Sequence, residues 1–284
     1  MKLAITVGDP RGIGPEVVAA ALADPRVTSA AEYVVIGSRH PVAELSAPDA
    51  GRRAGEAVVR AVELAVAGEV DGIVTAPLDK AALLAGGYDF PGHTEMLAAL
   101  TGSRVAMMLA SDRLRVVLAT THIPLREVPD AVTRSAITST AEITRAGLRD
   151  WFGIAEPRLA LCALNPHAGD GGRFGDEDDR VLLPAAREAG VAGPFPADTV
   201  FVRAIRGEFD AVIAPYHDVG MTAIKVASFG EAVNVTLGLP FPRTSPDHGT
   251  ALDIAGRGIA NPSSMIAAVL MCAAIVNRKC AARS

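Results

Sequence analysis

Short apolar runs alternate with longer amphipathic segments along most of this chain. The apolar runs have the length and composition of buried strands: Leu3–Val7, Tyr33–Ile36, Gly72–Thr75, Val105–Leu109, Leu114–Thr120, Arg158–Ala163, Ala211–Ala214 and Ala232–Leu237. Helical patterns lie between several of them: Glu16–Leu22, Gly55–Ala67, Ser135–Phe152 and Asp178–Ala189. Strands joined by helices usually pair in parallel, so this alternation predicts an α/β fold with a mainly parallel sheet.

One pair of runs departs from that alternation. Only the short turn Ala110–Asp112 separates the run ending at Leu109 from the next, which indicates an antiparallel hairpin and a mixed sheet. Neither an internal repeat nor a low-complexity linker divides the chain. Because 284 residues allow one large domain or two ordinary ones, we expect any division to be a cleft within a continuous fold.

The composition argues against several classes of protein. Half of the residues are hydrophobic and only 4% are aromatic, which suits helices on both faces of a sheet. The net charge is −5 and no extended Lys/Arg cluster occurs, so we expect no nucleic-acid partner. The cysteines lack CxxC spacing and predict neither a disulfide framework nor a zinc knuckle: Cys162, Cys272 and Cys280.

Two apolar segments bear on cellular location. The longest apolar run, Met265–Val276, has twelve residues, whereas about twenty are needed to cross a bilayer. It therefore predicts a buried helix. The first residues, Met1–Asp9, form a short strand entering a turn rather than a signal peptide. We expect a soluble, cytoplasmic protein with no membrane contact.

Five of the six histidines lie in short runs rich in Gly, Pro, Asn, Asp and Thr that follow or interrupt strand-like segments: His93, His122, His167, His217 and His248. Histidine is a common metal ligand and the usual acid or base near neutral pH. Loops at strand ends are where catalytic groups gather in α/β proteins. This distribution indicates an enzyme.

Three of these histidines could bind one metal ion. His122, His167 and His217 are separated by 45 and 50 residues, so no local spacing rule identifies them as ligands. Each follows a strand and precedes a turn, and three neutral imidazoles would suit a catalytic divalent metal. The alternative is three unrelated polar loop residues, and spacing alone does not decide between the two.

Two glycine-containing motifs could bind anions. Gly8–Glu16 ends a strand and enters a helix with Pro15 in its first turn, but it matches neither GxGxxG nor a Walker loop. A structural turn and a binding loop are both consistent with it. Gly92–Glu95 resembles a helix start, where Thr94 either caps the helix or, with His93, binds an anion.

Cations and carboxylates are concentrated between Tyr216 and Asn261. Lys225 and Arg243 could hold a carboxylate or a phosphate. Each could equally be an ordinary surface cation.

Several ordered motifs resemble the PdxA family nearly from end to end: Gly8-Asp9-Pro10-x-Gly12-Ile13-Gly14-Pro15-Glu16, Gly92-His93-Thr94-Glu95, Thr121-His122-x-Pro124-Leu125, Leu164–Gly169, Tyr216-His217-Asp218 and Leu237–Ala251. The resemblance implies a homodimer with its active site at the subunit interface. It also implies NAD-linked oxidation of a phosphorylated hydroxy acid, followed by loss of carbon dioxide. The substrate most strongly implied is 4-phosphooxy-L-threonine, which becomes 2-amino-3-oxo-4-phosphooxybutanoate in pyridoxal phosphate biosynthesis.

The same resemblance assigns roles to individual residues. It implies one divalent metal ion (Zn, Mg, Co or Mn) on His122, His167 and His217. It implies substrate contacts from His93, Thr94, Lys225, Asn234 and Arg243. The metal would lower the pKa of the substrate hydroxyl, and the candidates for the base are Asp218, Asp247 and Lys225.

The stretch His248–Pro262 is similar to the cofactor loop of isopropylmalate and isocitrate dehydrogenases, which bind NAD without GxGxxG. That similarity places Asp253 near the adenosine ribose and Asn261 near the adenine. We add Gly12 and Gly14 to the predicted cofactor residues. The fold implied is two α/β/α domains with a cleft between them, residues 1–88 with 239–284 and residues 89–238.

Some residues depart from the family pattern. The chain is shorter than typical members, and the usual Tyr-His-Asp-Gln-Gly reads Tyr216-His217-Asp218-Val219-Gly220. Relatives act on 4-phospho-threonate or erythronate, or on carboxylated aromatic cis-dihydrodiols, and these substrates are the alternative. A metal-dependent hydrolase and a non-catalytic binding protein are two further hypotheses. The predicted cofactor loop disfavours the first, and the complete set of predicted metal and substrate residues disfavours the second.

Overall fold

The computed structural model describes residues 1–38, 40–42, 44–228 and 230–281. The chain forms two compact units, residues 1–104 with 233–284 and residues 105–232. The boundaries predicted from the sequence lie after residues 88 and 238, whereas the contacts divide the chain after residues 104 and 232, for two reasons. Helix α5 (His93–Thr101) packs on α3 (Ala47–Val66), and strand β9 (Val233–Leu237) pairs with β10 (Arg243–Pro246), so both belong to the first unit.

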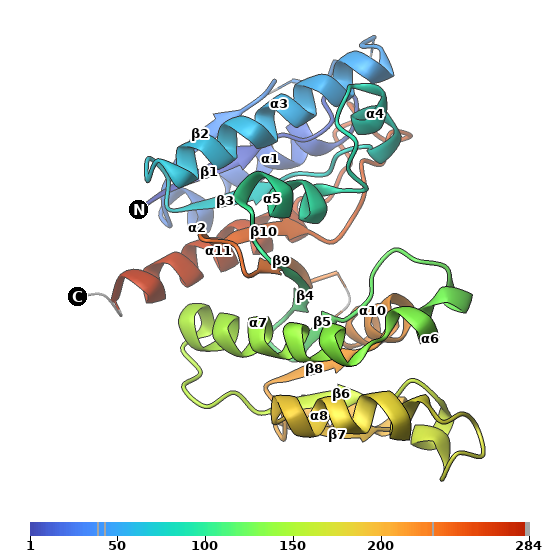
Figure 1. The fold of residues 1–284 in the computed structure, drawn as a ribbon. Helices are drawn as coiled ribbons and strands as arrows, with labels where there is room; N and C mark the ends of the chain where they lie inside the picture. The colour runs from blue at the N-terminus through green and yellow to red at the C-terminus, as the bar shows by residue number, and fades with distance from the viewer. Residues whose placement is uncertain (39, 43, 229, 282–284) are drawn as a thin grey trace. The chain divides into compact units, whose positions relative to one another are not determined.

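The first unit has the strand order β2-β1-β3-β10-β9. Its strands and remaining helices are β1 (Lys2–Thr6), α1 (Gly14–Ala23), α2 (Pro25–Thr28), β2 (Glu32–Ile36), β3 (Gly72–Thr75), α4 (Lys80–Ala85) and α11 (Ser263–Ala281) (Figure 1). β1 pairs in parallel with β2 and β3, β3 pairs in parallel with β10, and β9 is antiparallel to β10. The parallel strands end at one edge of this sheet, where the loops gather.

The second unit has the strand order β4-β5-β8-β6-β7. Its elements are β4 (Ala106–Ala110), β5 (Arg115–Leu118), η1 (Leu125–Glu127), α6 (Val128–Ala131), α7 (Arg134–Phe152), β6 (Leu159–Cys162), η2 (Pro166–Gly169), η3 (Asp178–Leu182), α8 (Leu183–Ala189), β7 (Ala192–Phe195), α9 (Ala197–Ile205), β8 (Ala211–Ala214) and α10 (His217–Ser228). The predicted β4–β5 hairpin is confirmed as antiparallel, and the other pairs are parallel. The predicted α/β class with a mixed, mostly parallel sheet is correct.

Two strands were not predicted, and proline explains both. β7 contains Gly193-Pro194 and lies at the edge of its sheet, where a residue without an N–H is tolerated. β10 is short and ends at Pro246, yet it is fully buried between β3 and β9. Its composition did not distinguish it from a loop.

Helix α11 is the buried C-terminal helix that the apolar run predicted. It is long and apolar enough to cross a membrane, but half of that window is buried inside the structure. It packs on β10 and β3 (Figure 1), and Thr244 on β10 donates a hydrogen bond from its hydroxyl to the carbonyl of Ala268 at 2.7 Å. These contacts are those of a core helix.

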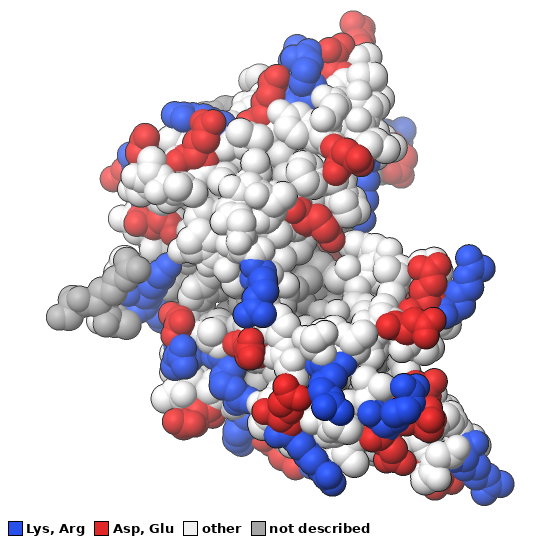
Figure 2. All heavy atoms as spheres, in the orientation of Figure 1, with Lys and Arg blue, Asp and Glu red and all other residues white. Residues whose placement is uncertain are grey.

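Charged side chains of both signs are interspersed on the face drawn in Figure 2. This face carries no continuous block of Lys and Arg over either unit. The view agrees with the charge balance of the sequence.

Candidate active site

The three histidines predicted as metal ligands follow three adjacent strands of the second unit. β8 lies between β5 and β6 and is parallel to both. His122 follows β5, His167 follows β6, and His217 is the first residue of α10, directly after β8. Because parallel strands end at the same edge of a sheet, the topology places all three residues along one edge.

Two of these histidines face each other. The ring centroids of His122 and His217 lie 5.5 Å apart, with 46° between the ring planes. The hydroxyl of Thr120 donates to the carbonyl of Pro215 at 2.7 Å, which ties the two loops together. Nδ1 of His217 lies 2.6 Å from Oδ1 of Asp218, so the carboxylate orients the ring and leaves Nε2 available for a ligand.

His167 lies apart from this pair, in the short helical turn η2. Its backbone is left-handed, with φ 55°, and its ring packs against Phe174 with the centroids 6.3 Å apart. Within the described residues, no three His, Cys, Asp or Glu side chains are grouped closely enough to hold a metal ion. The structure therefore brings His122 and His217 together, whereas His167 follows β6 and does not join this pair.

The donor chemistry of these residues fits a divalent metal ion. Imidazole nitrogens suit zinc and other transition metals. His122 and His167 are exposed and His217 is half-buried, so all three are accessible to an ion. Metal-binding histidines usually have one ring nitrogen hydrogen-bonded to a carboxylate or carbonyl, which fixes the ring while the other nitrogen binds the metal. Asp218 holds Nδ1 of His217 in this way.

A buried cation marks the first unit. Arg243, on β10, is 1% exposed. Its guanidinium donates to the hydroxyl of Thr236 at 2.9 Å and to that of Thr75 at 2.5 Å, and its Nε has no hydrogen-bond partner. Among the described residues no carboxylate forms an ion pair with it, although the charge of Glu95 acts on it from further away. Burial lowers its pKa to about 10, so the group remains a cation at neutral pH.

His93 lies within electrostatic reach of Arg243. The residue as a whole is half-buried, but its Nε2 is shielded from solvent and has no hydrogen-bond partner. Its pKa is lowered well below 6.5, first by burial and then by the charges of Arg243 and Lys80. His93 is therefore a neutral imidazole near two cations, a charge balance that an anionic ligand would improve.

The remaining predicted substrate residues divide between the two units. Asn234 pairs with Ser245 across β9 and β10, so its side chain lies on the same face of the sheet as Arg243 and Thr236. Thr94 lies in the first turn of α5, which begins at His93. Lys225 is exposed on α10 of the second unit.

One predicted role for Thr94 is wrong. The sequence predicts a helix from Glu95, but the helix begins two residues earlier, at His93. Its N-cap is Gly92, and no side chain caps it. Thr94 is therefore a residue of the first turn and its hydroxyl does not cap the helix.

The predicted cofactor glycines lie where two loops of the first unit meet. The backbone N–H of Ile13 donates to the carbonyl of Thr250 at 2.9 Å. A Cβ on Gly12 would lie 2.7 Å from that carbonyl oxygen, and one on Gly14 would lie 2.0 Å from the carbonyl oxygen of Val7. Close backbone packing therefore requires both glycines, whether or not a ligand also approaches them.

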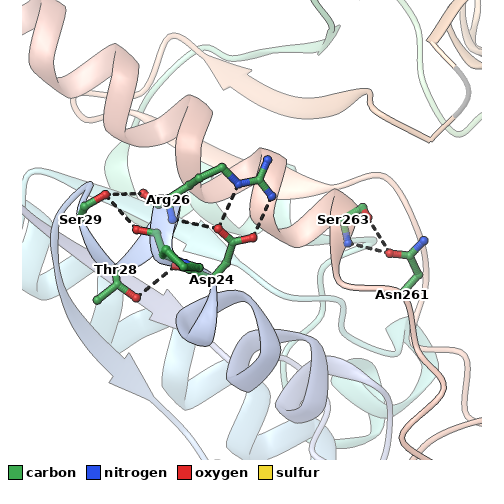
Figure 3. Close-up of polar contacts among 7 residues, drawn as sticks. Asp24, Arg26, Thr28, Ser29, Asn261 and Ser263 are labelled. Atoms are coloured by element: carbon green, nitrogen blue, oxygen red, sulfur yellow. Dashed lines mark hydrogen bonds and ion pairs between the residues drawn. The ribbon is translucent and has the colours of Figure 1, made fainter.

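The loop after β10 carries the other two cofactor candidates. Asp253 is exposed, and the same loop carries the exposed apolar side chains of Leu252 and Ile259. The side-chain oxygen of Asn261 accepts hydrogen bonds from the N–H and hydroxyl of Ser263, at 2.9 and 2.7 Å (Figure 3). Asn261 thus fixes the start of α11, a role that the sequence did not indicate.

The candidates for the base have different surroundings. Asp218 holds His217 and its side chain is 86% exposed. Asp247 follows β10, and its backbone N–H donates to Ser264 at 3.2 Å. Lys225 is exposed on α10. These surroundings give none of the three the buried environment that would single out a catalytic base.

The predicted substrate residues did not include the side chains that support the anion site. Thr75 and Thr236 orient Arg243 from two strands, and Lys80 acts on His93. Thr75 and Lys80 belong to the run Thr75–Lys80 at the end of β3, which was the available signal. Nothing in the sequence indicated a role for Thr236, because it lies within an apolar run that predicts only a strand.

A cavity of about 310 Å³ lies at the ends of β1 and β2, away from Arg243. It is lined by Val7, Gly8 and Pro10, by Ile36–Ser38, and by the α3 residues Arg53, Glu56, Ala57 and Arg60. None of the residues predicted for catalysis or binding lines it.

Known proteins resemble this chain over nearly its whole length. The family described as "Pyridoxal phosphate biosynthetic protein PdxA" matches residues 16–272. A 4-hydroxythreonine-4-phosphate dehydrogenase of a Ruegeria species is 43% identical, and the match covers 94% of each chain.

Solved structures agree with that result. A 4-hydroxythreonine-4-phosphate dehydrogenase from Klebsiella pneumoniae superposes with a TM-score of 0.86 at 38% identity, covering 97% of this chain and 99% of its own. A terephthalate 1,2-cis-dihydrodiol dehydrogenase from Burkholderia xenovorans gives 0.66 at 27% identity, covering 95% and 98%. An isocitrate dehydrogenase from Methylococcus capsulatus, at 18% identity and a TM-score of 0.56, shares the fold and confirms the predicted fold class.

Proposed function

The chain belongs to the PdxA family, and we propose that it is a metal-dependent, NAD-linked dehydrogenase of pyridoxal phosphate biosynthesis. The substrate proposed is 4-phosphooxy-L-threonine, oxidised at its hydroxyl-bearing carbon to 2-amino-3-oxo-4-phosphooxybutanoate, which then loses carbon dioxide. The similarity to named 4-hydroxythreonine-4-phosphate dehydrogenases over almost the full length supports this reaction.

The observation that carries the proposal is the buried Arg243. A guanidinium at 1% exposure without an ion-paired carboxylate among the described residues is costly unless an anion binds to it. We assign the substrate phosphate to Arg243 together with His93, Thr94 and Asn234 of the first unit, and Lys225 of the second unit stays a predicted substrate contact. An Nε–H on Arg243 and an imidazole nitrogen on His93 are both available as hydrogen-bonding groups.

We assign the metal to His122, His167 and His217. Their place after three adjacent parallel strands and the facing rings of His122 and His217 support this assignment. A divalent ion held there would act as a Lewis acid toward the substrate hydroxyl. Asp218 orients His217, and the proton released on oxidation would pass to Asp218, Asp247 or Lys225.

We assign NAD to the loops that contain Gly12, Gly14, Asp253 and Asn261. The exposed Leu252 and Ile259, in the same loop as Asp253, offer apolar surface for a planar base. A carboxylate at Asp253 would accept hydrogen bonds from ribose hydroxyls and repel a 2′-phosphate. Hydride transfer would convert the cofactor to NADH, which has its own absorbance.

The test is a turnover assay followed at the NADH absorbance with NAD and a divalent metal. We expect 4-phosphooxy-L-threonine to be oxidised, NAD to be used in preference to NADP, and the His167→Ala protein to be inactive while folded. An Asp253→Ala protein should lose part of the preference for NAD. Turnover by His167→Ala equal to that of the wild type would refute the metal assignment.

The similarity to a terephthalate dihydrodiol dehydrogenase supports a second candidate substrate. In that case Arg243 and His93 would hold the carboxylate of an aromatic cis-dihydrodiol. Phosphorylated threonate and erythronate belong in the same panel. Oxidation of a carboxylated dihydrodiol without oxidation of the phosphorylated substrates would establish this alternative.

The family relationship also supports a homodimer in the cytoplasm. Light scattering on the purified protein tests the first point, and fractionation of cells tests the second. A monomer at working enzyme concentration with full turnover would contradict the first assignment.

A further inference from the structure

The loop that carries His167 has an unusual backbone. Three residues other than glycine are left-handed: His167 with φ 55°, Ala168 with 54° and Asp170 with 46°. The neighbouring Gly169, Gly171 and Gly172 also have positive φ. Residues with a Cβ avoid this region because of steric repulsion, so a run of them persists only where surrounding contacts fix it.

A buried carboxylate fixes the neck of this loop. Asp178 is 1% exposed, and its two oxygens each accept one backbone N–H, from Leu164 at 2.8 Å and from Asn165 at 2.9 Å. These donors immediately precede η2, so the carboxylate joins the two ends of the loop. Asp178 uses both oxygens in this way and makes no capping bond to η3, the element that it begins.

A second carboxylate strengthens the same closure. The amide of Asn165 donates from Nδ2 to Oε2 of Glu177 at 2.7 Å. Gly175 packs against this contact so closely that a Cβ there would lie 2.6 Å from Nδ2 of Asn165. The left-handed turn, the glycine and both carboxylates therefore form one arrangement, which we call the Glu177–Asp178 clamp.

We propose that the Glu177–Asp178 clamp is a positioning device that fixes the backbone of the His167 loop and so limits the positions from which this imidazole can bind a metal ion. The inference rests on the proposed function, in which His167 is a metal ligand. A loop with a costly backbone would relax without its closure, and the imidazole would then have to be ordered when the metal binds. Contacts of this kind behind a ligand commonly change metal affinity about 10–100-fold.

The experiment compares metal affinity in the full-length protein. Metal-depleted wild type, Asp178→Asn, Glu177→Gln and His167→Ala are titrated with Co²⁺, and the dissociation constant and the visible Co²⁺ spectrum are recorded. Asp179→Asn is the matched control, because Asp179 is an exposed carboxylate next to Asp178. Each asparagine or glutamine variant removes one negative charge at nearly constant size.

Asp178→Asn should weaken Co²⁺ binding about 10–100-fold, because an amide offers one acceptor where two backbone donors require two. Glu177→Gln should have a smaller effect in the same direction, and Asp179→Asn should leave binding unchanged. A spectrum altered in Asp178→Asn but not in Asp179→Asn would show a changed ligand geometry, which general destabilisation does not produce.

Two negative outcomes are distinguishable. Equal affinity in wild type and His167→Ala would overturn the metal site itself, and the clamp with it. A large loss in His167→Ala combined with unchanged affinity in folded Asp178→Asn would overturn the clamp alone. If Asp178→Asn does not fold, the half-buried Glu177 supplies the test, and unchanged affinity and spectrum in Glu177→Gln would overturn the proposal.

Discussion

Arg243 combines two properties that rarely occur together in one residue. It is among the largest fully buried side chains of the first unit, and its guanidinium donates to neutral hydroxyls on two separate strands. The hydroxyls of Thr75 and Thr236 fix the plane of the guanidinium but do not neutralise it. A bound phosphate would supply the missing negative charge. Substrate binding would then offset the free-energy cost of burying the Arg243 cation.

Replacing Arg243 should therefore affect phosphorylated substrates selectively. A charged hydrogen bond contributes roughly 1.5–3 kcal/mol, so Arg243→Ala should lower kcat/KM about 10–100-fold on 4-phosphooxy-L-threonine. The loss on the dephosphorylated analogue should be much smaller. Steady-state kinetics on both compounds checks this, with Thr236→Val as a milder variant that keeps the cation. Equal losses on the two substrates would argue against phosphate binding by Arg243.

His93 should make the stability of the protein depend on pH. Its pKa in the folded state is well below 6.5 because of burial and the charges of Arg243 and Lys80, so the unfolded state binds more protons below pH 6.5. The free energy of unfolding is then undiminished above about pH 6.5 and falls as the pH drops below it. One proton gives a limiting slope of about 1.4 kcal/mol per pH unit.

Urea unfolding between pH 7.5 and 5 measures this slope. His93→Gln should reduce it, whereas His40→Gln, at an exposed position, should not. The same slope in wild type and His93→Gln would mean that other groups cause the acid sensitivity.

Among the elements, α11 depends on a side chain that lies outside it. Asn261 accepts two hydrogen bonds from Ser263 at the start of the helix. Asn261→Ala should lower the free energy of unfolding by about 1 kcal/mol, as loss of a helix cap does. Asn261→Asp keeps the acceptor oxygen and should retain this stability, but it replaces the amide that we assign to the NAD site with a carboxylate.

Urea unfolding and NAD titration of the two variants separate the two roles. We expect Asn261→Ala to be impaired in both measurements and Asn261→Asp only in NAD binding. Wild-type NAD affinity in both variants would leave Asn261 with a role in the helix alone.

The apolar pattern predicted the elements in which buried positions carry apolar side chains and exposed positions carry polar ones. Gly72–Thr75 and Ala211–Ala214 were predicted with the observed bounds, because each is a continuous apolar run between polar turns. α10 was not predicted, since Gly220 and the polar residues at its start resemble a loop. α3 begins earlier than expected because Ser46 caps it, accepting the N–H of Asp49, and Pro48 starts its first turn.

The candidate site was predictable only in part for a related reason. A histidine that follows a strand can be recognised from the few residues around it, and three such histidines follow adjacent strands. The contact between Thr75 and Arg243 joins positions 168 residues apart, and it exists only because β10 pairs with β3. Local sequence carries no information about that pairing.

On the scale of the whole molecule, each unit has a cysteine in its core. Burial raises the pKa of Cys162, on β6, and of Cys272, on α11, to about 12 in each case. Cys280 is exposed. Thiolates are the reactive form, so native protein should react rapidly with a thiol reagent such as DTNB at one position, and unfolded protein at three.

Cys280→Ser should abolish the rapid reaction in the native state and leave two thiols after unfolding. Rapid modification of a second thiol in native protein would mean that one of the two cores opens readily.

The divided first unit has a consequence for how the protein is made. Residues 1–104 leave the ribosome first, yet β3 acquires its neighbour β10 only when residues 243–246 have been translated. Residues 105–232 are continuous and are complete before that point. Until then the nascent chain presents β3 as an open, apolar sheet edge, which is a site of aggregation. Ribosome-associated chaperones would therefore be needed most during translation of residues 105–242, before the strand that closes this edge exists.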